Sequence, residues 1–238
     1  MTTLLVAHGT RNPLGVRMIG DLAAAVADVL DEPVRVGFVD VLGPTPAEVL
    51  STMRDEPTVV VPAFLSSGMH VRVDVPRYVA ESGHERVTVT SPLGPSPELA
   101  RALLCRLVGA GWQRDDHVVL VAAGTRDLRG HGELRYTAAA LSALVGSRVS
   151  IAFAAPTRDG SGYPSVSEVV ARARQSGARR IALSSYLLAD GLFHSRLYDA
   201  GADVVAAPLG LHAAVIRLVC RRRREAVLTA PALVGVTS

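Results

Sequence analysis

Short apolar runs alternate with longer segments in which apolar residues recur at helical spacing. The apolar runs predict strands at residues 2–7, 34–41, 59–65, 86–90, 117–123, 149–155 and 180–188. Several of these runs are uninterrupted and rich in valine, which is typical of strands buried on both faces of a parallel sheet. Between the strands, helical spacing is clear at Met18, Ile19, Leu22, Val26 and Leu30. Alternating strands and helices indicate the α/β class.

Other helices are predicted from residues typical of helix starts as much as from the spacing of apolar residues. Thr45 is a candidate N-cap for a helix that runs to Met53, and Pro97 begins one that runs to Ala110. Residues 70–82 should also be helical, although Pro76 fits only in a first turn or at a kink.

The second part of the chain repeats the first. Gly9-Thr10-Arg11 returns as Gly124-Thr125-Arg126, 115 residues later, and Phe38 and Phe153 share that offset. The repeat predicts an N-terminal half at residues 1–112 and a degenerate C-terminal half at 113–238. Each half should form a mainly parallel, four-stranded sheet flanked by helices. A ligand cleft is expected between the halves, at the carboxyl ends of the strands.

Composition excludes several classes of protein. Aromatic residues make up only 4% of the 238 residues and hydrophobic residues 49%, so valine, leucine and alanine must form the core. No apolar run is long enough to span a bilayer, and the start MTTLLVAHGT lacks the pattern of a signal peptide. We therefore expect a cytoplasmic protein without a membrane partner. Cys105 and Cys220 match neither a disulfide framework nor a metal site, so both are expected to be core thiols.

The formal charge of +3 favours anionic ligands but is weak evidence for nucleic acid. No RNA-binding signature and few aromatic residues for base stacking are present, so no nucleic-acid partner is expected. The tight run from Arg221 to Arg224 is expected to be a solvated helix end.

Three candidate functional residues follow the first three strands. His8 ends the first strand, Asp40 ends the second, and His70 follows the third. Two imidazoles and a carboxylate suit Fe²⁺, Co²⁺, Ni²⁺ or Zn²⁺, and they also suit proton removal near neutral pH. A lone histidine in this position more often caps a helix or lies on the surface. A hydrogen bond between His8 and Asp40 alone is the alternative.

The repeat makes these candidates more specific. His8 aligns with Ala123 and Asp40 with Ala155, while His194 resembles His70 in position. The second half therefore keeps the structural frame but lacks two of the three candidate ligands. A purely structural role would more easily be met in both halves, so we expect the first half to carry the chemistry.

Three stretches, LLVAHGTRNP, GFVD and PAFLSSGMHVRVDVP, resemble the sirohydrochlorin chelatases among the class II tetrapyrrole chelatases. Residues Ala7 to Arg11 match the strand-one motif of this family, with Thr10 in place of the usual serine. Residues Pro62 to Pro76 match the third-strand motif. The family usually has glutamate where Asp40 stands. The resemblance covers both halves, as in the long, duplicated members of the family.

The resemblance implies a metal chelatase that inserts a divalent ion, with Fe²⁺ favoured, into sirohydrochlorin to give sirohaem. Cobalt insertion for cobalamin synthesis and a non-catalytic carrier of tetrapyrrole or metal are the alternatives. No cofactor is implied beyond the substrate ion, Fe²⁺ or Co²⁺. His8 and His70 would bind the ion and accept the pyrrole protons, with Asp40 as charge partner or proton relay.

Sirohydrochlorin carries many carboxylates, so the resemblance also implies a cleft lined by guanidinium groups and other donors. The candidates for binding it are Arg11, Ser66, Ser67, Gly68, Arg72, Arg126, His194 and Arg196. Because both halves would supply walls of the cleft, a monomer is expected.

Overall fold

Strands and helices alternate along the computed structural model, which describes residues 1–156 and 162–229. The first half contains β1 (Thr2–Ala7), α1 (Pro13–Leu30), β2 (Val34–Phe38), α2 (Pro46–Ser51), β3 (Thr58–Pro62), the π-helical turn η1 (His70–Asp74), α3 (Val75–Ser82), β4 (Val87–Val89) and α4 (Pro97–Gly109). The second half contains β5 (His117–Ala122), α5 (Leu128–Val145), β6 (Ser150–Phe153), α6 (Val166–Gln175), β7 (Ile181–Tyr186), α7 (Leu192–Tyr198), β8 (Val204–Val205) and α8 (Ala213–Thr229).

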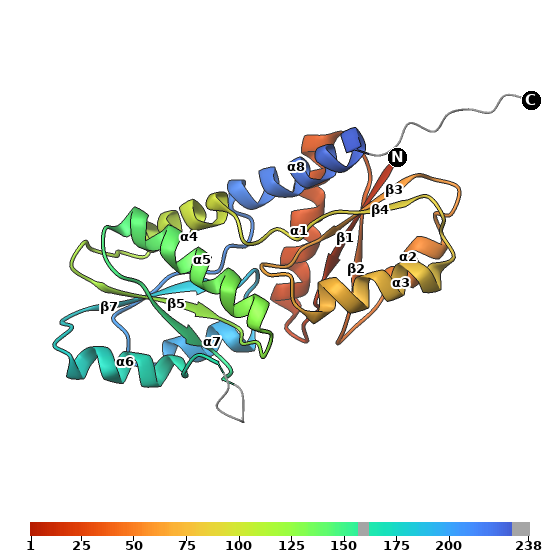
Figure 1. Ribbon diagram of the computed structural model, residues 1–238. Helices are drawn as coiled ribbons and strands as arrows, with labels where there is room; N and C mark the ends of the chain where they lie inside the picture. The colour runs from red at the N-terminus through yellow and green to blue at the C-terminus, as the bar shows by residue number, and fades with distance from the viewer. Residues whose placement is uncertain (157–161, 230–238) are drawn as a thin grey trace, which may run out of the picture.

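The strands form two parallel four-stranded sheets with the same order, β2-β1-β3-β4 and β6-β5-β7-β8. The predicted α/β architecture of two similar sheets flanked by helices is therefore confirmed (Figure 1). The strand predicted at residues 34–41 ends earlier, at Phe38. The chain still follows β1, because the Asp40 amide donates to the His8 carbonyl at 3.0 Å, and it turns away at Val41, where φ is +73°.

The last helix of each half packs on the other half. α4 lies beside α5 and against β7, whereas α8 runs back along α1 and against β3 (Figure 1). The repeat in the sequence therefore does not coincide with the packed units. Each sheet is covered on one face by a helix from the opposite half, and neither half encloses its core without the other.

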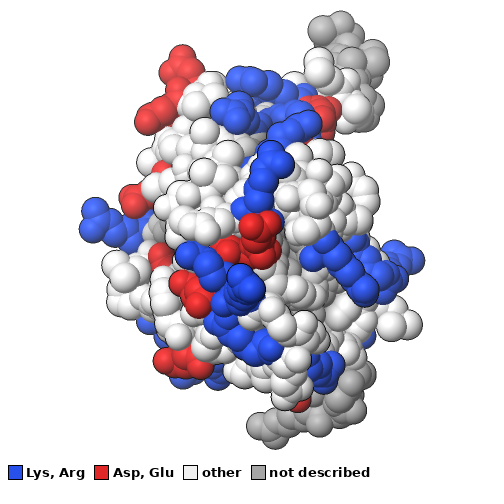
Figure 2. Space-filling model, turned by 90° about the vertical axis from the view of Figure 1, so that its left-hand side faces the viewer, with Lys and Arg blue, Asp and Glu red and all other residues white. Residues whose placement is uncertain are grey.

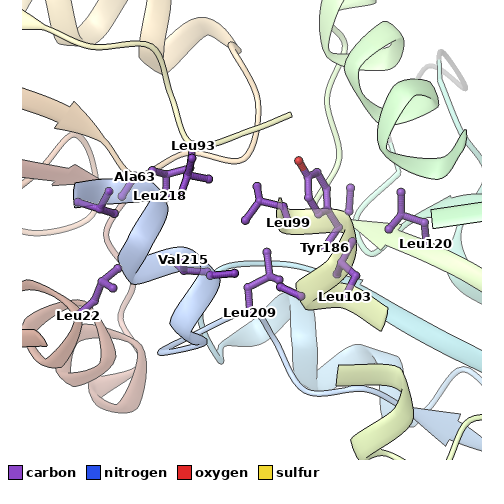
Figure 3. Packing of buried hydrophobic residues seen from close by; sticks show 14 of the residues in the cluster. Leu22, Ala63, Leu93, Leu99, Leu103, Leu120, Tyr186, Leu209, Val215 and Leu218 are labelled. Carbon is purple, nitrogen blue, oxygen red and sulfur yellow. The ribbon is translucent and has the colours of Figure 1, made fainter. Parts of the chain in front are cut away.

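One hydrophobic cluster consequently runs through both halves. It passes from Leu22 and Ala63 in the first half through Val215 and Leu218 of α8 to Leu120 of β5 (Figure 3). Leucine, valine and alanine dominate this cluster, as the composition predicts. Burying a leucine or valine side chain contributes about 1.5–3 kcal/mol.

Cys220 is one of the two expected core thiols, and its side chain is buried in this cluster. Cys105 is exposed, so that prediction was wrong. It lies on α4 between the buried Leu103 and Leu107, on the side of the helix that is open to solvent.

The arginine run in α8 is also not a solvated helix end. Arg223 pairs with Glu32 at the end of α1, and Arg221 pairs with Glu98 at the start of α4. These ion pairs join parts of the chain that are far apart in sequence, so the run helps to fix α8 on the first half.

Basic and acidic side chains are interspersed at the end of the molecule formed by the second half (Figure 2). Pairs such as Arg180 with Asp116 and Arg174 with Asp203 neutralise part of the arginine excess. Among residues 1–156 and 162–229, no helix is both long and apolar enough to cross a membrane.

Candidate active site

His8 and His70 lie next to each other at the carboxyl edge of the first sheet. Their ring centroids are 4.7 Å apart and the rings are nearly perpendicular, at 88°. This contact follows from the strand order, because β1 and β3 are parallel neighbours whose ends meet at one edge. His8 is exposed, and 38% of the His70 side chain is accessible. Both imidazoles are therefore open to a ligand from solvent.

The backbone around Gly9 fixes the exit of His8 from β1. Gly9 has φ of +93°, and an added Cβ would lie 2.1 Å from the Asp40 carbonyl oxygen. Only glycine fits such a conformation and such a close approach. Gly124 repeats this arrangement against the Ala155 carbonyl oxygen, at 2.3 Å. The GTR turn is thus a structural feature of both halves, and only the first half places a histidine before it.

His70 begins η1, and its ring is fixed by Asp74 one turn later. The His70 Nδ1 lies 2.7 Å from Asp74 Oδ2. A carboxylate at Nδ1 favours the tautomer that keeps the Nε2 lone pair available to bind a cation. Partial burial acts to raise the pKa of Asp74, but hydrogen bonds from His70 and Arg77 outweigh it and hold that pKa below its ordinary value.

Asp74 is a further candidate site residue, through its contact with His70, and is not among the residues predicted from the sequence. Its signal is the spacing His70-x-x-x-Asp74, which places two side chains on one face of a helix. Phe64 adds a second support, because its ring stacks on His70 with centroids 6.0 Å apart.

The carboxylate of Asp40 does not join the two imidazoles. Its Oδ1 accepts a hydrogen bond from the Val41 amide at 2.7 Å, and the side chain is exposed. Within the described parts of the chain, no group of three or more His, Cys, Asp or Glu residues is arranged to hold a metal ion. The expected set of two imidazoles and a carboxylate is therefore corrected to a pair of imidazoles. The tight turn at Val41 explains why Asp40 is directed onto the backbone.

Two of the expected substrate-binding residues connect the halves instead. The Ser67 amide donates to Glu133 at 2.8 Å, its hydroxyl also donates to Glu133, and Arg72 pairs with Asp127. These partners lie in or next to α5, so the donors of Ser67 and Arg72 are already engaged. Their placement argues against direct contact with a ligand. Ser66 and Gly68 are half-buried in the same loop and remain candidates.

The other three arginines predicted to bind substrate are solvent-exposed. Arg11 lines an open cavity of about 600 Å³ between the first turns of α1 and the loop at Val41 and Leu42. Arg126 and Arg196 are exposed and form no ion pair with any residue that the structure describes. All three guanidinium groups stay candidates for binding an anion.

His194 is buried inside the second half, contrary to the expectation that it lines the cleft. Its Nδ1 lies 2.8 Å from Asp190 Oδ1, and its Nε2 lies 3.3 Å from the Ala206 carbonyl oxygen. The ring also contacts Tyr198, with centroids 5.3 Å apart. Because both nitrogens are engaged and only 5% of the side chain is accessible, this placement argues against substrate binding.

Comparison with known proteins gives one family for both halves. The family model described as CbiX matches residues 2–110 and again residues 117–226. A sirohydrochlorin cobaltochelatase of Methanothermobacter thermautotrophicus is 31% identical over 129 residues. That match covers 45% of this chain and 90% of the relative, so the relative corresponds in length to about one half of this chain.

Solved structures match the whole chain. SirB from Bacillus subtilis with Fe³⁺ has a TM-score of 0.77 and 21% identity, and the match covers 94% of each chain. The sirohydrochlorin chelatase SirB from the subspecies spizizenii, in complex with cobalt, has a TM-score of 0.76 and 19% identity over 96% of each chain. At this level of identity the likeness establishes the fold.

Proposed function

The chain belongs to the CbiX family, and from this premise we propose that it is a sirohydrochlorin chelatase, which inserts a divalent metal ion into a metal-free tetrapyrrole. The observation that carries the proposal is the pair of accessible imidazoles, His8 and His70, in contact at the carboxyl edge of the first sheet. Loops of the second sheet approach the same edge, so both halves contribute to the surroundings of the pair.

The two imidazoles are suited to the two tasks that metal insertion requires. Neutral imidazole is a good ligand for borderline divalent ions, and the same group accepts protons near neutral pH. Insertion replaces two pyrrole N–H protons by one divalent ion, so a ligand that is also a base serves both steps. In this proposal Asp74 stabilises the positive charge when His70 accepts a proton. Asp40, which is exposed beside His8, relays the proton to solvent.

We propose that the tetrapyrrole binds where the carboxyl edges of the two sheets face each other. The exposed guanidinium groups of Arg11, Arg126 and Arg196 are available for its carboxylates. Large apolar side chains are exposed at the starts of helices after four of the strands. They are Leu14, Met69, Leu128, Leu192 and Phe193. These side chains would cover the apolar face of the macrocycle.

For the metal we propose Fe²⁺, with sirohaem as the product. Two imidazoles can bind either Fe²⁺ or Co²⁺, so the metal ligands alone do not choose between the two ions. Cobalt insertion for cobalamin synthesis is the second candidate, favoured by the name of the cobaltochelatase relative. Beyond the substrate ion, we propose that the reaction needs no cofactor.

One assay separates a chelatase from a carrier. Purified protein is mixed anaerobically with excess sirohydrochlorin and either Fe²⁺ or Co²⁺, and insertion is followed by the absorption spectrum of the macrocycle. Many turnovers per protein, with kcat/KM higher for Fe²⁺, would support the proposal. Conversion of only one equivalent per protein would show a carrier. A higher kcat/KM for Co²⁺ would show that cobalt, and not iron, is the preferred metal substrate.

We also propose that the enzyme works as a cytoplasmic monomer without a nucleic-acid or membrane partner. The argument for a monomer is that the two halves of one chain supply both sides of the site. Light scattering during size-exclusion chromatography tests it, and a dimer as active species would overturn it.

A further inference from the structure

The segment that carries His70 is held from the second half at three points. It runs from the end of β3 at Pro62 to η1. Its first two residues still bond to the first half, because the Ala63 amide donates to the Val6 carbonyl oxygen of β1 and the Phe64 carbonyl oxygen accepts from the Gly94 amide. The three contacts are Tyr186 Oη to the Leu65 carbonyl oxygen at 2.7 Å, Glu133 to Ser67, and Asp127 to Arg72. The position of His70 therefore depends on side chains that come from β7, α5 and the N-cap of α5.

The two acidic contacts form one connected unit. Glu133 accepts from both the amide and the hydroxyl of Ser67. Arg72 donates to the Ser67 carbonyl oxygen at 2.9 Å and pairs with Asp127. Hydrogen bonds to a carboxylate are stronger and more directional than those between neutral groups. The chain is thus fixed at Ser67, which precedes His70, and at Arg72, which follows it.

The internal repeat supplies a comparison within the same chain. Asn12 caps α1 as Asp127 caps α5, and Met18 lies 115 residues before Glu133. Arg196 follows His194 by two residues, as Arg72 follows His70, but it is exposed and forms no ion pair in the described part of the chain. The charged contacts are therefore specific to the loop that carries His70. The equivalent positions, Met18 and Arg196, do not form such contacts in the described part of the chain.

We propose that Glu133 and Asp127 are positioning residues that set His70 at the correct distance from His8. This inference rests on the proposed function. His8 needs no such help, because it ends the inner strand β1 and its carbonyl is hydrogen-bonded to Asp40. His70 follows seven residues of loop, residues 63–69, and two ligands bind one ion well only when their relative position is fixed. In this way the second half, which has no equivalents of His8 and Asp40, would position a metal ligand of the first half.

Two substitutions test the proposal in the full chain. Asp127→Asn removes the charge that pairs with Arg72 but keeps an N-cap, as Asn12 shows in the first half. Glu133→Gln weakens the hydrogen bonds that the side chain at position 133 accepts from Ser67. The probe is Co²⁺ alone, titrated into the tetrapyrrole-free protein and followed by its visible absorption. We expect the double variant to bind Co²⁺ about 10-fold more weakly and to lose about 10-fold in kcat, the usual effect of removing outer support from a metal ligand.

Glu32→Gln is the matched control. Glu32 pairs with Arg223 and so also joins distant parts of the chain, but it contacts Thr3 at the opposite edge of the sheet from His8. It should lower Tm while leaving the Co²⁺ affinity at the wild-type value. If the Asp127 and Glu133 variants behave like this control, the inference is wrong and the proposed function stands. If His8→Ala and His70→Ala also bind Co²⁺ as the wild type does, the proposed function itself fails.

Discussion

The imidazole of His8 meets the imidazole of His70 edge to face, 4.7 Å between ring centroids, although 61 residues of chain separate them. Two parallel neighbouring strands, β1 and β3, create this contact. The geometry allows one ion to be reached by both rings. It also means that either histidine alone is an incomplete site.

Replacing either histidine should therefore disable the enzyme without unfolding it. We expect His8→Ala and His70→Ala each to lower kcat by ~10²–10⁴-fold, the usual effect of losing a general base. The double variant should be little worse than either single one, because the residues act as a unit. Steady-state kinetics at saturating metal, with Tm as the folding control, measure this. Losses that multiply in the double variant would mean that the two residues act in separate steps.

Asp74 should matter through the orientation of His70. Asp74→Asn keeps the size of the side chain but removes the negative charge 2.7 Å from Nδ1. We expect a loss of ~10–100-fold in metal affinity or kcat, as for other carboxylates that support a ligating histidine. Glu81→Gln is the control, because Glu81 also pairs with Arg77 but does not contact His70. Equal effects of the two variants would show that only the surface charge matters.

The sequence was sufficient to predict the two sheets because their strands are uninterrupted apolar runs, and the GTR turns relate one half to the other. It did not reveal that α4 and α8 each pack on the opposite half, an arrangement that we call the exchange of the two helices. Both helices are amphipathic, and the same apolar face would fit the sheet of either half, so the choice of partner depends on three-dimensional packing. Ion pairs such as Arg223 with Glu32, 191 residues apart, are likewise invisible to local patterns.

At the candidate site, the sequence brought His8 and His70 together through the ends of neighbouring strands. It did not show that the Asp40 carboxylate lies apart from the two imidazoles or that His194 is buried, because both depend on side-chain direction. Asp40 turns onto the Val41 amide at a positive-φ residue, and His194 turns inward to the Ala206 carbonyl. Nothing in their neighbouring residues shows these directions. The contacts of Ser67 and Arg72 with α5 depend in turn on how the two sheets face each other.

His194 should behave as a structural residue. His194→Ala removes a buried imidazole together with its contacts to Asp190 and Tyr198, although the Ala206 carbonyl keeps the Ser185 hydroxyl as a donor, so we expect a loss of about 0.5–3 kcal/mol in the free energy of unfolding. The kcat of the folded protein should stay within a few-fold of the wild type. Urea unfolding and kinetics on the same sample measure both. A large loss of kcat with unchanged stability would assign His194 to the chemistry after all.

The stability of the second half should depend on pH through Asp203. The hydrogen bond from the Ile181 amide is the largest effect on its pKa and lowers it. Burial opposes this, but the hydrogen bond and charge of Arg174 and the charge of Arg180 add to the lowering, so the pKa stays below its ordinary value. A carboxylate with a lowered folded-state pKa contributes stability above its unfolded pKa and loses it as the pH falls through the folded value. Asp203→Asn should therefore make the acid limb of a Tm–pH profile less steep below about pH 4, the ordinary pKa of an aspartate. An unchanged acid limb would contradict this assignment.

The exchange of α4 and α8 predicts that the two halves unfold together. Leu103 lies on α4 and is fully buried in the cluster that continues to Tyr186 and Leu120 of the second half (Figure 3). Leu103→Ala should cost about 2–5 kcal/mol in the free energy of unfolding. Val108→Ala on the same helix is the control, because Val108 is 58% exposed and its loss should change stability little.

Cooperativity itself can be measured with the single tryptophan. Trp112 follows α4 and packs against the shared cluster, so its fluorescence reports the junction, while far-ultraviolet circular dichroism reports all helices. If each sheet needs a helix from the other half, both signals should change at the same urea concentration, in the wild type and in Leu103→Ala. A fragment of residues 1–112 should stay unfolded, because it leaves β3 and α1 without the cover of α8. Two separate transitions, or a folded fragment, would show that the halves are independent despite the exchange.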